Sequence, residues 1–319
     1  MDFREWLIDD LPCKKNFEEL LRTFDKGTFI PFIGAGPSSI LGPPDWRHLL
    51  KKMASSSNFK IRLRKNFEGS IDYPKAFSHL YKKFKEAKKN SSDFFKALFD
   101  NVKLDKAGFN PLYLRIWRFF KLCVTTNFDE ALRNAYTEYT EIKKSKTEIK
   151  LREYYFNWVK MDNFENSIVY LHGHKDINFA IVKKEDYDYF YPSVSQKIGI
   201  PILENFLERI YKEKTIIFIG FSFSDYYIRE FFLHLAKNGK ELCRKHFWIT
   251  NDTCSFYTKE KILNFYEYWE QFNIFPIVYN HKYDIFVEEL IALAGKRCEM
   301  KESMGKQREM KKEGASSDD

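Results

Sequence analysis

An apolar run that ends in a glycine turn restricts the fold of this chain more than any other feature. The run is Phe29-Ile-Pro-Phe-Ile33, and the turn is Gly34-Ala-Gly36. Such a run is typical of a parallel strand that is covered on both faces, and glycines permit close backbone contacts that a Cβ atom would block. Backbone N–H groups at such a turn often bind phosphate, although the same turn also serves as a plain strand-to-helix corner.

Further apolar segments of similar length follow, separated by stretches with helical periodicity. Short apolar strands that alternate with helices are typical of an open parallel sheet with helices on both faces. We therefore predict an α/β fold, a Rossmann-like doubly wound parallel sheet of about six strands. The strands after the first are expected at residues 121–126, 167–171, 215–219, 246–250 and 274–279.

Each predicted strand ends in small or hydrogen-bonding residues. Ligands of open α/β sheets bind outside the carboxyl ends of the strands, so these residues are expected to line one crevice. The strand ends are Gly34-Ala-Gly36, Thr126-Asn-Phe-Asp129, His172-Gly-His174, Gly220-Phe-Ser222 and Asn251-Asp252.

The segments around the strands complete the predicted organisation. We expect a leading helix from about Asp2 to Lys26, and a helical insertion at about 48–120 whose aromatic residues form its own core. Residues 1–295 are predicted to form a single domain. Residues 296–319 mix charges without apolar periodicity, which predicts a disordered tail.

Charge and cysteine content narrow the functional classes. The formal net charge is +8, and residues 51–106 hold 15 Lys and Arg against 6 Asp and Glu, an excess of +9. A basic face attracts nucleic acid or an acidic partner, but lysine-rich helices are also ordinary solvated surface. The sequence has no signal-peptide pattern and no apolar run near the roughly 20 residues of a membrane span, so we expect a cytoplasmic protein without a membrane partner. The five scattered cysteines indicate neither a disulfide framework nor a zinc site.

The strand-end motifs, in their order, resemble those of the sirtuin family from about Gly27 to Tyr279. The longer run Ile219-Gly-Phe-Ser-Phe-Ser-Asp225 is similar to the form found in bacterial sirtuin-like defence proteins. The motifs that carry the resemblance are Gly34-Ala-Gly-Pro-Ser38, Gly42-Pro-Pro-Asp-Trp-Arg47, Thr125-Thr-Asn-Phe-Asp129, His172-Gly173 and Gly220-Phe-Ser222.

Two departures from the family pattern bear on activity. Sirtuins that act on histones carry two Cys-x-x-Cys pairs after the catalytic histidine, whereas residues 173–215 contain no cysteine. A structural zinc site needs four N or S ligands, so we expect no zinc. Thr126 also replaces a glutamine of the family motif. These departures favour hydrolysis of NAD itself over deacylation.

The resemblance implies three catalytic residues. Cleavage of the bond between nicotinamide and ribose develops oxocarbenium character on the sugar, as in glycoside hydrolysis. Asn127 would fix the ribose or the attacking water, Asp129 would stabilise positive charge, and His172 would act as general base.

The remaining site residues would hold NAD as substrate. The amides of Gly34, Ala35 and Gly36, together with Ser38, would face the pyrophosphate. The other predicted contacts are Asp45 and Arg47 at the nicotinamide side, Thr126 in place of the family glutamine, and Gly220, Ser222 and Asn251 at the adenosine side.

Plain structural roles remain open for several of these residues. Asn127 and Asp129 are also good caps for the helix that follows, and His172 is also compatible with a satisfied buried histidine. His174 has no matched role, and Asp225 is expected first as a helix cap.

The sequence as a whole favours a sirtuin-like NAD glycohydrolase that depletes NAD in bacterial antiphage defence. The resemblance further implies a homo-oligomer and a regulating partner, such as a hexameric DNA-translocating ATPase or another defence protein. One alternative is an NAD-dependent protein deacylase or ADP-ribosyltransferase. Another is a non-catalytic subunit that binds NAD or ADP-ribose.

Overall fold

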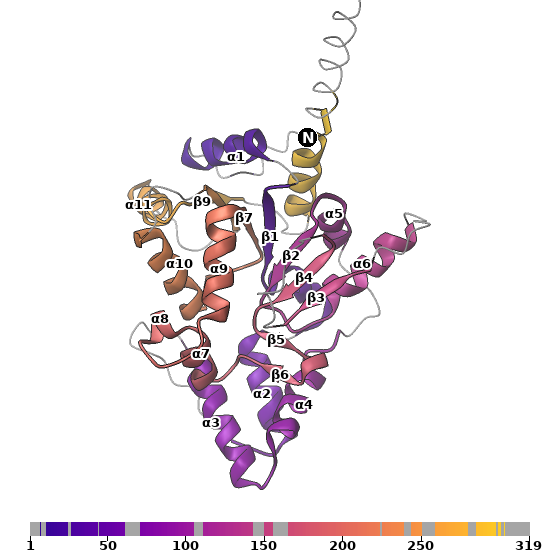
Figure 1. Ribbon diagram of the computed structural model, residues 1–319, viewed down its shortest axis with the longest axis vertical. Coiled ribbons are helices and arrows are strands. Elements are labelled where there is room, and N and C mark those ends of the chain that lie inside the picture. Colours follow the sequence, from indigo (N-terminus) through magenta and orange to yellow (C-terminus); the bar gives the residue numbers. More distant parts are fainter. Residues whose placement is uncertain are drawn as a thin grey trace, which may run out of the picture.

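A parallel sheet of seven strands forms the centre of the computed structural model (Figure 1). The strand order is β3-β4-β2-β1-β7-β8-β9, and every pair of neighbours is parallel. The predicted fold class is confirmed, and the sheet has one strand more than the six expected. The strands are β1 (Phe29–Ile33), β2 (Leu122–Thr125), β3 (Arg152–Tyr154), β4 (Ser167–Tyr170), β7 (Thr215–Ile219), β8 (His246–Thr250) and β9 (Ile274–Val278).

The structure describes most of the chain between the two termini. The described positions are 7, 11–24, 27–43, 45–60, 71–104, 111–142, 150–155, 165–223, 225–238, 244–250, 259–279, 285–297, 299–300 and 303. The predicted site residue Asn251 and most of the predicted tail lie outside them.

Strand β1 marks the point at which the strand order reverses. It pairs with β2 on one edge and with β7 on the other, so that Phe32 lies between Val124 and Phe218. From β1 the chain fills one half of the sheet and then returns to β7 to fill the other half. Crevices at such switch points are the usual ligand sites of open α/β sheets.

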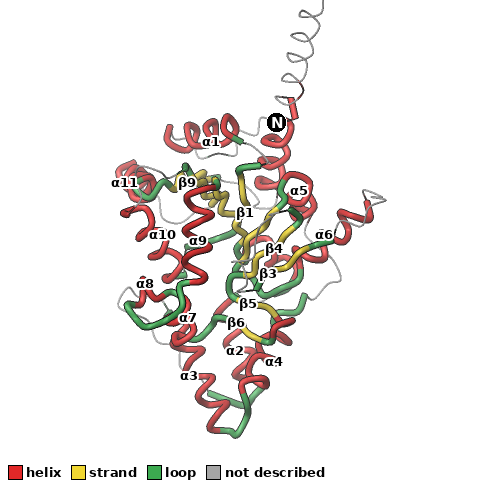
Figure 2. The backbone as a smooth tube through the Cα atoms, in the orientation of Figure 1, coloured by secondary structure: helices red, strands yellow, loops and turns green. Residues whose placement is uncertain are grey.

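Helices cover both faces of the sheet (Figure 2). Alternate side chains of β1 enter two separate cores: Phe29 and Ile33 one, Ile30 and Phe32 the other. The first core includes side chains of α1 (Leu11–Thr23), α5 (Pro111–Phe119), α6 (Ala131–Ile142) and helical residues 285–297. The second core includes side chains of α9 (Ile202–Glu213) and α10 (Tyr226–Asn238). Helix α11 (Lys259–Glu270) packs beside β9.

A third core lies below the sheet, at the end opposite α1 (Figure 1). It is formed by α2 (Trp46–Ser56), α3 (Tyr73–Glu86) and α4 (Ser91–Asn101). Five phenylalanines of these helices are buried in that core, while Trp46, Tyr73 and Tyr81 are partly buried against it; the five are Phe77, Phe84, Phe94, Phe95 and Phe99. Helix α5, which was predicted within the same insertion, packs on the sheet instead.

Short elements connect β4 to β7 and pack against the third core. The small sheet of β5 (Gly173–His174) and β6 (Phe179–Ala180) is antiparallel. It encloses η4 (Lys175–Ile177) and is followed by α7 (Lys184–Phe190) and α8 (Pro192–Ser195). Helices α3 and α7 lie side by side, so this connection helps to close the space below the sheet.

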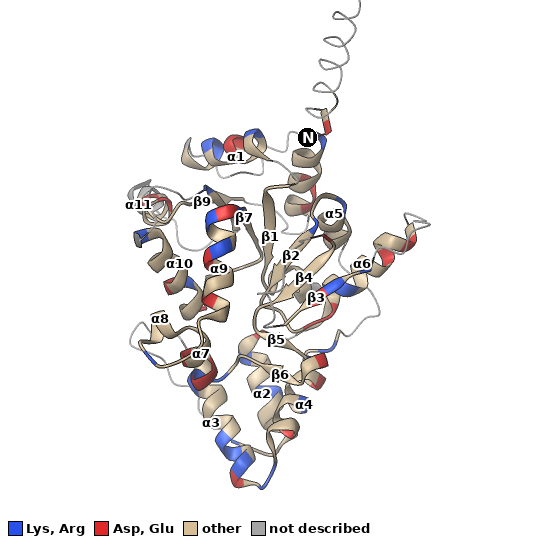
Figure 3. Cartoon of the chain, viewed as in Figure 1, with Lys and Arg blue, Asp and Glu red and all other residues tan. Residues whose placement is uncertain are grey.

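Lysine residues are concentrated on α3, at its end farthest from the sheet (Figure 3). Among them, the Lys82 side chain is 74% exposed and lies 4.0 Å from Glu86. Exposed pairs of this kind contribute little to stability. None of the described helices is both long and apolar enough to cross a membrane.

The unfolding free energy is expected to depend on pH through His246. This residue is fully buried at the start of β8, where its Nδ1 accepts a hydrogen bond from Ile216 N at 3.1 Å. Burial lowers the pKa of His246 to about 3. The unfolded chain therefore binds a proton near pH 6.5 that the folded chain does not, so stability falls as the pH drops toward 3.

At pH 5 we expect a loss of about 2 kcal/mol from this group relative to pH 7, at roughly 1.4 kcal/mol per pH unit below 6.5. Urea denaturation at both pH values measures it. His246→Asn, whose amide oxygen replaces Nδ1 as acceptor, should be less stable at pH 7 but should show a smaller loss between the two values. An equal loss in both proteins would contradict the assignment.

Candidate active site

The glycine turn after β1 lies in backbone contact with the end of β7. Gly34 N donates to Ile219 O at 2.9 Å, and Gly36 N donates to Gly220 O at 3.1 Å. A Cβ atom on Gly34 would lie 2.3 Å from Gly220 O, and one on Gly36 would lie 2.8 Å from Gly220 Cα. Only glycine fits at these two positions without displacing a strand end.

The same contacts affect the predicted phosphate site. Two of the three amides expected to face a pyrophosphate, those of Gly34 and Gly36, already donate to carbonyl groups of the chain. Ala35 is exposed at the tip of the turn, and its N–H makes no hydrogen bond within the described residues. Of the three amides, that of Ala35 is therefore the one available to a ligand.

Asn127 lies just beyond β2 and is held by the glycine turn. Its Nδ2 donates to Gly34 O at 2.9 Å and to Ser38 Oγ at 3.3 Å. A carbonyl oxygen only accepts hydrogen bonds, so Gly34 fixes which end of the amide faces the turn. Within the described residues no donor contacts Asn127 Oδ1, which leaves this oxygen as an acceptor for a ligand or water.

Ser38 supports Asn127 from below the turn. It lies in η2 (Gly36–Leu41), is 1% exposed, and shares a hydrogen bond of 2.8 Å with the Tyr113 hydroxyl of α5. Ser38 thus lines the cavity described below but also joins Asn127 to Tyr113. Its contacts are those of a group that positions Asn127, and the role near a pyrophosphate stays a prediction.

Asp129 serves as a helix cap and also faces the cavity. Its Oδ1 accepts a hydrogen bond from Ala131 N at 2.9 Å, at the start of α6. Burial raises the pKa of Asp129, while hydrogen bonds from Ala131 N and Ser38 oppose that rise. The capping role considered for this residue is therefore present, and it leaves Asp129 among the residues that line the cavity.

His172 follows β4 and is 1% exposed. Its Nε2 lies 3.4 Å from the Tyr191 hydroxyl and 3.9 Å from Asp225 Oδ2, while its Nδ1 has no hydrogen-bond partner within the described residues. Burial lowers the pKa of His172, and the Asp225 carboxylate opposes that change. The histidine is therefore neutral at neutral pH, the state required of a general base.

Of the two residues predicted at the nicotinamide side, Asp45 lines the cavity and Arg47 does not. Asp45 caps α2 by accepting from His48 N at 2.7 Å, and it lines the cavity. Partial burial opposes a low pKa for Asp45, but hydrogen bonds from His48 lower it overall. Arg47 and Asp45 are both exposed, but Arg47, on α2, is not among the residues that line the cavity.

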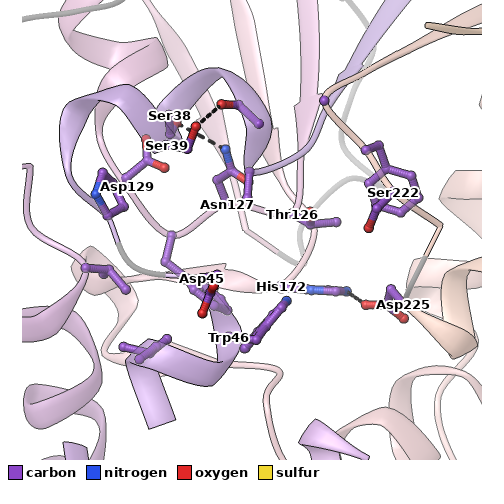
Figure 4. Close-up of a pocket in the computed structure, with 18 of the residues that line it drawn as sticks. Ser38, Ser39, Asp45, Trp46, Thr126, Asn127, Asp129, His172, Ser222 and Asp225 are labelled. Atoms are coloured by element: carbon purple, nitrogen blue, oxygen red, sulfur yellow. Dashed lines mark hydrogen bonds and ion pairs between the residues drawn. The ribbon is translucent and has the colours of Figure 1, made fainter. Parts of the chain in front are cut away.

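These strand ends enclose a cavity of about 550 Å³ below the sheet (Figure 4). Ser38, Asn127 and Asp129 lie on one side of it, and His172 and Asp225 lie on another. Its volume is within the range of about 300–1,000 Å³ that is usual for small-molecule sites. The predicted site residues that line it are Ala35, Gly36, Ser38, Asp45, Thr126, Asn127, Asp129, His172, Gly220 and Ser222.

Sequence reasoning missed several residues that also shape the cavity. Trp46 and Tyr73 line it from α2 and α3. Both residues also line a second cavity of about 730 Å³, which lies beside the first. Asp225 also lines both cavities. Its position shortly after the Gly220-Phe-Ser222 motif could have indicated a site residue, but that position was interpreted first as a helix cap. Asp225 does cap α10, since its Oδ1 accepts a hydrogen bond from Ile228 N at 3.2 Å.

The arrangement provides a hydrogen-bond acceptor, a neutral imidazole and buried carboxyl groups around one space. A sugar held there would meet Asn127 Oδ1 and His172, which are suited to orienting a hydroxyl group and removing its proton. Within the described residues, no group of three or more His, Cys, Asp or Glu side chains is placed to hold a metal ion.

Comparison with known proteins gives one family match. Residues 121–277 match the family model described as SIR2-like domain. This range contains Asn127, Asp129 and His172 and begins after the glycine turn. None of the curated proteins matches the chain.

Solved structures of Sir2 homologues show similarity over most of the chain. A Sir2 homologue in complex with NAD is 12% identical to this chain, with a TM-score of 0.47. The similarity covers 88% of this chain and 94% of that protein's chain. Two mutant Sir2 homologues in complex with ADP-ribose are 13% and 15% identical, with TM-scores of 0.43 and 0.42. In both cases the similarity covers 88% of this chain and 96% of the other protein's chain.

Proposed function

We propose that this chain is an NAD glycohydrolase, which uses water to cleave NAD into nicotinamide and ADP-ribose. The observation that carries the proposal is the cavity of about 550 Å³ beside the switch point of the sheet, which Asn127 and His172 both line. The sirtuin-like order of motifs and the SIR2-like match of residues 121–277 support NAD as the substrate.

The proposed reaction breaks the bond between ribose C1′ and the nicotinamide nitrogen. Nicotinamide leaves with the bonding electron pair, and the positive charge that develops on the ribose is stabilised by the carboxylate of Asp129. Asn127 Oδ1 accepts a hydrogen bond from the attacking water or from a ribose hydroxyl. The water oxygen bonds to C1′, and His172 accepts the proton.

The products distinguish hydrolysis from acyl transfer. We would incubate the purified chain with NAD, with and without an acetylated peptide, and separate the products by chromatography. Nicotinamide and ADP-ribose in equal amounts without peptide are the expected result. Acetylated ADP-ribose that forms only with peptide, together with no free ADP-ribose in its absence, would contradict hydrolysis.

Transfer to an acceptor is the second candidate, either as deacylation or as ADP-ribosylation. The cavity of about 730 Å³ favours it, because this space adjoins the first cavity at Trp46, Tyr73 and Asp225 and offers room for an acceptor. The same incubation tests it, since an acceptor would become modified while free ADP-ribose decreases.

The proposed cellular role is depletion of NAD in bacterial antiphage defence. The similarity of the run from Ile219 to Asp225 to bacterial sirtuin-like defence proteins supports it. Such an enzyme needs an inactive state, which we assign to assembly as a homo-oligomer or to a partner such as a hexameric DNA-translocating ATPase. NAD levels in phage-infected cells that express the parent chain or His172→Ala would test this role, and equal levels in both would contradict it.

A further inference from the structure

Asp225 lies between the two cavities, directly beside His172. Its Oδ2 is 3.9 Å from His172 Nε2 (Figure 4) and accepts a hydrogen bond from the Tyr187 hydroxyl at 2.9 Å. Its Oδ1 accepts from Ile228 N at 3.2 Å, at the start of α10. The carboxylate is thus held by a helix terminus on one side and by a tyrosine on the other, and neither contact neutralises its charge.

The surroundings of His172 contain few charges. Tyr187 packs edge-on against the imidazole at 5.3 Å between ring centres, and Tyr191 lies at 6.5 Å. The carboxyl groups of Asp45 and Asp129 line the same cavity on other elements. Among the described residues, Asp225 is the acidic group close enough to form an ion pair with His172 once the imidazole is protonated.

A general base becomes positively charged when it accepts a proton. For a histidine that is 1% exposed, this charge is costly unless an opposite charge is near, because burial disfavours the charged form. A fixed carboxylate 3.9 Å away reduces that cost through its electrostatic attraction to the imidazolium.

We infer that Asp225 is a positioning residue for the reaction, which acts through His172 and stabilises the imidazolium that forms when His172 accepts the proton. The inference rests on the proposed NAD cleavage, since it assigns a second residue to the base of that reaction. It also gives Asp225 a role beyond the capping of α10.

Asp225→Asn tests the inference with little change in shape. Asparagine is as good a helix cap as aspartate, and its amide oxygen accepts one of the two hydrogen bonds that the carboxylate holds. The substitution therefore removes mainly the negative charge. We expect kcat for NAD cleavage to fall about tenfold to a hundredfold with KM changed less than about threefold, because the lost interaction forms only as the proton moves.

The pH profile separates this role from a purely structural one. The Asp225 carboxylate raises the pKa of His172 against the lowering effect of burial. Without the carboxylate the pKa falls further, so the base stays neutral at lower pH, and the acidic limb of kcat should move to lower pH in Asp225→Asn. A fall in kcat from partial misfolding would leave that limb in place.

The control removes the same charge elsewhere. Asp93→Asn changes a carboxyl group in the first turn of α4, where it accepts from Asn90 N at 2.8 Å and lines neither cavity. This variant should retain the parent kcat and pH profile. Parent-like values for Asp225→Asn would overturn the inference.

A second measurement is independent of activity. An NMR titration of the His172 ring, assigned with His172→Ala, should give a lower pKa in Asp225→Asn than in the parent. A parent chain without NAD cleavage would overturn the proposed function. In that case an unchanged His172 titration would also overturn the pairing with Asp225, whereas a lowered pKa would support it.

Discussion

Replacing His172 with alanine is expected to lower kcat for NAD cleavage by about 10²-fold to 10⁴-fold, the usual contribution of a positioned general base. His172 lines the cavity, and its neutral imidazole is the group there that is suited to accept the proton. Binding of ADP-ribose should persist, because Ala35 and Asn127 lie on other strand ends. Release of nicotinamide measures the rate, and calorimetry with ADP-ribose measures the binding.

His234→Ala is the matched control, since it removes the same side chain from an exposed position on α10 that does not line the cavity. It should retain the parent rate. If His172→Ala also retained the parent rate while ADP-ribose still bound, the proton acceptor would lie elsewhere and the proposed mechanism would be wrong. Loss of both binding and rate, with a lower melting temperature, would instead show that the imidazole supports the fold.

The sheet could be predicted because its central strands are continuous apolar runs. Strand β3 was missed because its sequence, Arg152-Glu-Tyr154, carries no such run. It lies at the edge of the sheet and is partly exposed, so apolar residues are not required there. Its Glu153 instead forms an ion pair with Arg133 of α6 at 2.8 Å, a contact that local periodicity does not reveal.

The gathering of site residues followed from the fold, since the carboxyl ends of parallel strands meet at one edge. The orientation of each side chain did not. Arg47 is exposed because the turn of α2 places it away from the cavity, and Ser38 is buried because Tyr113 of a distant helix packs onto it. The pairing of Asp225 with His172 depends on where α10 begins relative to β4, which no spacing along the chain specifies.

The substitution Gly34→Ala, in the glycine turn, is expected to lower both the stability of the fold and the rate of NAD cleavage. The added Cβ atom would lie 2.3 Å from Gly220 O and 2.7 Å from Phe221 Cα. Both are backbone atoms, so the ends of β1 and β7 must separate. We expect the free energy of unfolding to fall by about 1–3 kcal/mol, the usual cost of overpacking.

The same displacement should reduce NAD cleavage, because Gly34 O is the acceptor that fixes the amide of Asn127. Urea denaturation and nicotinamide release would be measured in parallel. Ala35→Ser, which also adds one heavy atom but at the exposed tip of the turn, should leave stability near that of the parent. A Gly34→Ala protein with parent stability and parent cleavage would show that the two strand ends can separate without moving Asn127, and the close contact with Gly220 would then have no part in the function.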